Sequence, residues 1–90
     1  MADLAMLIDA READLLAWAR SERKKVTPDG WCGLSTAALM FGVSPSTLRR
    51  WCDEGLPPEI RTRDVKDRTQ FHVRSVAVYL IHAELSAENS

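Results

Sequence analysis

The sequence predicts a mainly α-helical fold in which two short helices, joined by a tight turn, are followed by a β-hairpin and a last helix. Three observations predict it. An apolar segment with helical spacing ends at Gly42. Ser44 and Pro45 then mark a helix start, because a hydroxyl caps the first turn and proline fits the first helical position. After Gly55, apolar or Thr positions alternate with arginine, as in a half-exposed strand.

The length and composition predict one globular domain. The chain has 90 residues, which leaves no room for a second core. Apolar residues make up 46% and charged residues 28%, as in ordinary globular folds. No run of about 18 apolar residues is present and no secretory signal is recognisable, so we expect a cytoplasmic protein outside the membrane. The predicted core members are Leu39, Val43, Leu48, Trp51, Leu56, Phe71, Val76, Tyr79 and Leu80.

An extra helix is predicted at the N-terminal side, over residues 3–24. Apolar residues such as Leu7 and Leu15 recur there at three- and four-residue spacings, and the stretch contains no Gly or Pro. Its cationic end suits the negative end of a helix dipole. Residues 26–30 then form a turn-rich linker. The apolar stripe has two interpretations: it folds back on its own domain, or it packs against another copy or a partner protein.

The next two helices form the predicted helix-turn-helix. The first begins near Ser35, which can cap it, and stops at Gly42, since glycine adopts a left-handed conformation at little cost. The second covers Pro45–Glu54 and stops at Gly55. Two helices joined by a turn of three to four residues containing Gly are the signature of this motif.

A hairpin and a last helix complete the predicted domain. Residues 60–63 and 68–72 are predicted strands joined by a turn over 64–67. A final helix is expected from about residue 74 to 84. The fold class is therefore mainly α, a winged helix-turn-helix with a small two-stranded β-hairpin wing and an extra N-terminal helix. The predicted divisions are an arm and linker (1–30), a winged helix-turn-helix domain (31–85) and a flexible tail (86–90).

The sequence predicts neither an enzyme nor a metal or cofactor site. It contains one Tyr, two His and two Cys, and it lacks a glycine-rich phosphate loop and any recognisable nucleophile–base set. No Cys/His cluster has zinc spacing. We interpret Cys32 and Cys52 as two part-buried thiols.

The segment from Leu34 to Pro57 resembles the winged helix-turn-helix of the MerR and excisionase superfamily. The resemblance rests on an Ala-rich helix, then Gly-Val-Ser, then Ser-Thr-Leu-Arg-Arg-Trp and Gly-Leu-Pro. It covers about residues 33–85 and agrees best over Gly42–Pro57. It implies double-stranded DNA binding, with the Ser44–Glu54 helix in the major groove and the wing (60–72) on an adjacent minor groove or the backbone. The wing departs from the family pattern, since Asp64 and Asp67 dilute its basic tip.

Within this superfamily, the resemblance points to a phage excisionase, that is, a recombination directionality factor, in a bacterial or phage-infected cell. A small transcriptional regulator and the DNA-binding domain of a phage terminase small subunit are alternatives. The expected partners besides DNA are an integrase or another copy of the chain, held through the N-terminal helix. In a different class, the chain would be an adapter that binds protein through that apolar helix.

Charge distribution gives modest support to DNA binding. The net charge is −1, but residues 44–74 carry seven basic and five acidic side chains, hence +2 locally. Arg49 and Arg50 are the first candidates, because arginine forms paired hydrogen bonds to phosphate or guanine. The alternative is a solvated helix face in which they pair with Asp53 or Glu54.

The remaining candidates lie in the first turn of the same helix and in the wing. Ser44, Ser46 and Thr47 stand where recognition helices approach bases or grip phosphate, although capping alone also explains them. The cations of the hairpin either bind phosphates or keep an edge hairpin soluble. These are Arg61, Arg63, Lys66 and Arg68.

Overall fold

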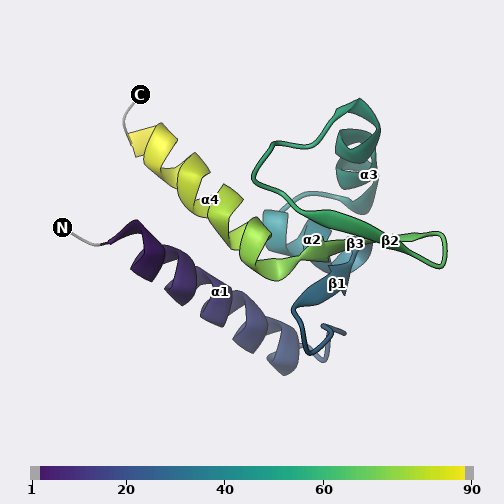
Figure 1. Cartoon of the computed structure of the whole chain (residues 1–90), viewed down its shortest axis with the longest axis horizontal. Helices are drawn as coiled ribbons and strands as arrows, with labels where there is room; N and C mark the ends of the chain where they lie inside the picture. The colour runs from purple at the N-terminus through teal and green to yellow at the C-terminus, as the bar shows by residue number, and fades with distance from the viewer. Residues whose placement is uncertain (1–2, 89–90) are drawn as a thin grey trace.

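The computed structural model describes residues 3–88, which form four helices and a three-stranded antiparallel sheet (Figure 1). The structure is mainly helical, as predicted. Within the described residues, no helix combines the length and the apolar character needed to cross a membrane. The elements are α1 (Leu4–Ser21), β1 (Trp31–Gly33), α2 (Leu34–Phe41), α3 (Pro45–Glu54), β2 (Thr62–Val65), β3 (Arg68–His72) and α4 (Val73–Glu88).

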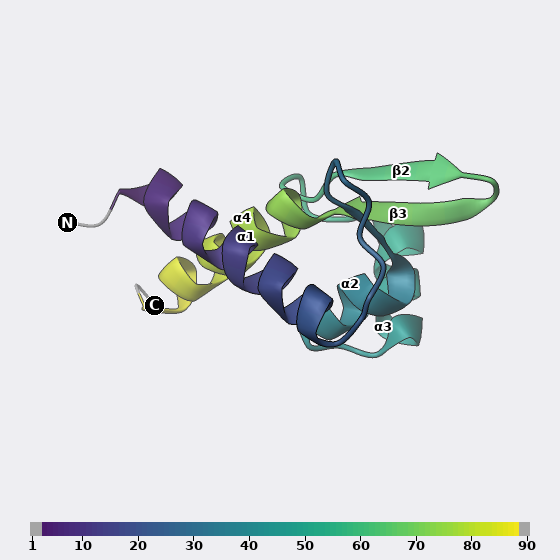
Figure 2. The same cartoon turned by 90° about the horizontal axis from the view of Figure 1, so that it is seen from below.

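The first helix folds back on the last one. Figures 1 and 2 show α1 lying along α4 on the side of the molecule away from the β2–β3 hairpin. Ile8 of α1 is buried against Ala77 and Ile81 of α4. Arg11 pairs with Glu84 at 2.7 Å, which adds a polar contact between the two helices. Of the two interpretations of the apolar stripe, the structure therefore contains the intramolecular one.

Helix α4 is longer than the sequence predicts. It begins at Val73 and continues to Glu88, so the first three residues of the predicted tail (86–90) are helical. Residues 89 and 90 lie outside the described part of the chain. The apolar residues that mark the predicted helix end near residue 84, and the polar last turn carries no periodicity from which its helical state can be inferred.

Local capping rules explain the turn between α2 and α3. Gly42 adopts φ 74° and ψ 30°, the left-handed conformation that ends α2. Ser44 then caps α3, since its Oγ accepts a hydrogen bond from the Thr47 amide at 3.1 Å. The prediction that Ser35 caps α2 is wrong. The capping residue is Gly33, which has no side chain, so Ser35 already belongs to the helix.

The predicted two-stranded hairpin is present as β2 and β3, but it belongs to a three-stranded sheet whose third strand, β1, is not predicted. Strand order is β1-β3-β2, with Cys32 opposite Phe71 and Arg63 opposite Gln70. Strand β1 has only three residues, too few for an alternating pattern to be read from sequence. Strand β2 begins two residues later than predicted, because Ile60 closes a turn with the Pro57 carbonyl and is buried in the core.

The main core lies between α2, α3, α4, the sheet and the C-terminal half of α1. Phe71, Leu48 and Val76 are fully buried, as predicted. Leu39 is not a core residue, since 54% of its surface is exposed. It points away from the side of α2 that carries Ala37 and Ala38, both fully buried. The other predicted core members pack partly buried against this cluster: Val43, Trp51, Leu56, Tyr79 and Leu80.

Replacing Gly42 with alanine should lower the free energy of unfolding by about 1–2 kcal/mol, because an L-residue is strained in the left-handed conformation. No atom lies within 4 Å of the added Cβ, so steric overlap does not contribute. Urea denaturation followed by circular dichroism measures the change. Gly42→Asn is the matched control, because asparagine tolerates the left-handed conformation better than alanine does and should lose less stability. Equal losses in the two variants would contradict the assigned turn.

Candidate nucleic-acid interface

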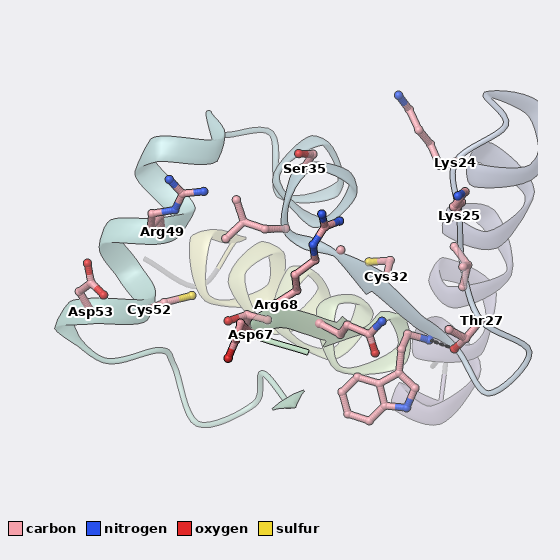
Figure 3. Close-up of a pocket in the computed structure, with 16 residues that line it drawn as sticks. Lys24, Lys25, Thr27, Cys32, Ser35, Arg49, Cys52, Asp53, Asp67 and Arg68 are labelled. Carbon is pink, nitrogen blue, oxygen red and sulfur yellow. Dashed lines mark hydrogen bonds between the residues drawn. The ribbon is translucent and has the colours of Figure 1, made fainter. Parts of the chain in front are cut away.

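An open groove of about 950 Å³ runs between α3, the sheet and the segment that joins α1 to β1 (Figure 3). Helix α3 contributes Arg49, Cys52 and Asp53 to one wall. The start of β3 contributes Arg68, and the α1–β1 segment contributes Lys24 and Lys25. Four cations and two carboxylates, Asp53 and Asp67, line the groove, so its lining carries a net charge of +2.

The cations of the groove differ from the other basic residues in their partners. Within residues 3–88, Arg49, Arg68, Lys24 and Lys25 form no ion pair and no side-chain hydrogen bond. Away from the groove, three arginines are paired with carboxylates at 3.4 Å or less: Arg11, Arg63 and Arg74. The charges that line the groove are therefore available to an anionic ligand.

The two arginines of α3 have different surroundings. Arg49 lines the groove and has no carboxylate partner, although Asp53 lies one turn further along the helix. Arg50 is outside the groove lining and is 4.0 Å from Glu54, at the limit of an ion pair. The predicted i,i+4 pairing thus exists for Arg50, weakly, and not for Arg49.

In the first turn of α3, the structure assigns a capping role to Ser44. Its Oγ accepts the Thr47 amide and donates to the Thr47 Oγ1 at 2.9 Å, which ties both side chains together. Ser46 is exposed and makes no side-chain hydrogen bond with the described residues. Of the three predicted hydroxyl contacts, Ser46 is therefore the one whose side chain is unengaged.

Among the predicted wing residues, Arg63 already contacts other residues of its own domain. Its guanidinium lies 4.4 Å from the centre of the Trp31 ring, and its Nε donates to Gln70 at 2.7 Å. It also pairs with Asp29 at 3.4 Å. Arg61 and Lys66 are exposed but do not line the groove, so the structure brings only Arg68 of the four predicted wing cations together with Arg49.

The sequence reasoning missed Lys24 and Lys25. It interpreted them only as a cationic helix end that suits the helix dipole. The signal that distinguishes them is the Thr27–Gly30 turn, which reverses the chain and returns it to β1 beside the groove.

The same turn contains a carboxylate whose pKa is shifted. The Thr27 hydroxyl donates a hydrogen bond to Asp29 and, together with Arg63, holds the pKa of the Asp29 carboxyl below its ordinary value.

The two cysteines have different environments at the groove. Cys32 is fully buried, and burial raises the pKa of its thiol to about 11. Cys52 is half-buried on α3, where burial first and Asp53 second raise the pKa of its thiol. Both are free thiols. Among residues 3–88, no three His, Cys, Asp or Glu side chains gather as a metal site would require.

Comparison with known proteins adds no relative: no family model matches the chain, and neither a curated protein nor a solved structure is significantly similar to it. What the molecule contains is thus a mainly helical domain with a small antiparallel sheet and a cation-lined groove between a helix and a hairpin.

Proposed function

We propose that this protein binds double-stranded DNA, with α3 in the major groove and the β2–β3 hairpin against the neighbouring backbone. The observation that carries the proposal is that Arg49 of α3 and Arg68 of β3 line one groove and that neither is neutralised by a carboxylate. An α-helix fits the major groove, and arginine binds phosphates and guanine edges through paired hydrogen bonds.

The exposed face of α3 supports this mode of binding. Leu48 faces the core, whereas Ser46, Arg49 and Arg50 are exposed on the opposite side, at spacings that bring them onto one broad face. The hairpin projects from the same end of the domain as α3, as Figures 1 and 2 show. A helix and a projecting hairpin at one end of a domain suit simultaneous contact with a groove and its flanking phosphates.

Among DNA-binding roles, we propose that of a phage recombination directionality factor. This rests on the resemblance of Gly42–Pro57 to the MerR and excisionase superfamily. A transcriptional regulator and a terminase small-subunit domain use the same module, and the bound DNA locus distinguishes the three. An integrase or a second copy would be the protein partner. An adapter role through α1 is less favoured, because α1 buries Ile8 and Ala19 in its own domain.

The test is a fluorescence anisotropy titration with duplexes from the neighbourhood of the gene and with scrambled duplexes, over a series of salt concentrations. Affinity should fall steeply with salt, because each phosphate contact releases counterions and contributes about −0.9 to the slope of log K against log salt. The same samples, treated with an alkylating reagent, should show slower modification of Cys52 when DNA is bound, since Cys52 lines the groove.

Two results would overturn the proposal. One is absence of binding at low salt by protein that is folded by circular dichroism. The other is binding that is insensitive to salt and leaves Cys52 unprotected, which would indicate a protein partner on another surface. Buried Cys32 serves as the internal control, because its modification should be slow with or without DNA.

A further inference from the structure

We infer that the segment joining α1 to β1 is a third DNA contact, in which Lys24 and Lys25 bind backbone phosphates across the groove from α3. The inference rests on the proposed function and extends it to a part of the chain outside the helix-turn-helix and the wing. Figure 3 shows the two lysines on one side of the groove and Arg49 with Asp53 on the other, with Ser35 between them.

The backbone of the α1–β1 segment is fixed at both ends. At the end of α1, Arg23 has φ 56° and the Lys24 amide donates to the Ala19 carbonyl at 2.7 Å. On the other side of the lysines, Val26 forms a β-bridge with Cys32, and the Thr27 amide donates to the Trp31 carbonyl at 2.8 Å. The backbone that carries the two lysines is therefore held in place by hydrogen bonds on both sides. This reduces the backbone conformational entropy that is lost when the lysines bind a ligand.

Both lysines are exposed and without a carboxylate partner. Neither forms an ion pair within residues 3–88, and both line the groove. By contrast, Arg11 of α1 forms an ion pair with Glu84 of α4. These two exposed lysines at the rim of the groove are not neutralised by the protein itself. Their charge can therefore attract an anionic ligand.

The arrangement of charges favours an extended polyanion over a compact one. The four cations come from three elements around an open groove, and Asp53 and Asp67 lie among them. A single small anion at the centre would meet these carboxylates as well as the cations. A duplex carries phosphates along two strands, so separate phosphates can meet the lysines and the arginines, while the bases face the helix.

The experiment measures the salt dependence of DNA binding for Lys24→Gln, Lys25→Gln and the double variant. We expect each substitution to reduce the magnitude of the salt slope by about 0.9 and the double variant by about twice that. The loss should be the same on native and scrambled duplexes, because phosphate contacts carry no sequence information. Lys24→Arg with Lys25→Arg should restore the wild-type slope, which separates loss of charge from a change in fold.

Arg11→Gln is the matched control, because it also removes one positive charge but from the α1–α4 contact. If the double lysine variant has the slope of Arg11→Gln while wild type binds DNA, the third contact is overturned and the proposed function stands. If wild type fails to bind any duplex at low salt, both are overturned. A double variant with a reduced slope and an unchanged unfolding midpoint supports the contact.

Discussion

Replacing Arg49 with alanine should weaken DNA binding by about 5- to 150-fold, the equivalent of about 1–3 kcal/mol for one paired arginine contact. Arg49 is expected to have the largest effect of the basic residues because it lies on α3 and lines the groove. It also forms no ion pair within the protein that would compete with DNA for its charge. The measurement is anisotropy titration against the preferred duplex and a scrambled one. A larger loss on the preferred duplex indicates a base contact, and equal losses indicate a phosphate contact.

Two neighbouring variants make this result specific. Arg50→Ala removes the same charge from the next position, where Glu54 already lies 4.0 Å away, so a smaller loss is expected. Arg11→Ala removes a charge from the α1–α4 contact, and its affinity should remain within about twofold of wild type once salt screening is considered. If Arg49→Ala binds DNA as tightly as Arg11→Ala does, the proposed contact between α3 and DNA is contradicted.

The largest effect on stability is expected at Phe71, in the central strand of the sheet. Its side chain is fully buried, and its ring is in edge contact with Phe41, with the ring centres 6.5 Å apart. Phe71→Ala should lower the free energy of unfolding by about 3–5 kcal/mol, because it removes buried apolar surface and leaves a cavity. Domains of this size have about 5–15 kcal/mol in total, so much of the stability would be lost.

Chemical denaturation at constant temperature checks this expectation, with the midpoint and the slope fitted separately. Leu39→Ala is the control, because Leu39 is also a large apolar residue but is 54% exposed. A change within about 0.5 kcal/mol is expected there. A Leu39→Ala variant as destabilised as Phe71→Ala would show that the α2 face assigned to solvent is buried by a partner or another copy.

The sequence predicts best those features of the fold that depend on interactions between residues close together in the chain. Gly42, Ser44 and Pro45 determine the end of α2 and the start of α3 through backbone conformation and capping, which depend on few distant contacts. The predicted turn of the hairpin over 64–67 is too long: Asp64 and Val65 belong to β2, and Lys66 and Asp67 alone form the turn, both with positive φ as a two-residue hairpin turn requires.

The features that the sequence does not predict depend on contacts between residues far apart in the chain. Strand β1 is defined by pairing with β3 rather than by a pattern within its three residues. The exposure of Leu39 follows from which side of the eight-residue α2 meets the sheet, and a short apolar helix does not specify this by itself.

The candidate site divides in the same way. The type of chemistry, arginine on the exposed face of α3, could be read from residue identity and helical spacing. Which cations are free could not, because Arg63 is occupied by Trp31 and Asp29, two residues more than thirty positions away. Lys24 and Lys25 join the groove only through the turn that returns the chain to β1.

The packing of α1 on α4 has a consequence for how the molecule is made. The polar contacts between these helices join residues separated by 62 to 73 positions, as for Arg74 with Glu12 and Arg11 with Glu84. During synthesis α1 is therefore translated before the other three described helices, and Ile8 stays uncovered until α4 has been translated. Until then its apolar stripe is open to chaperones and to neighbouring chains.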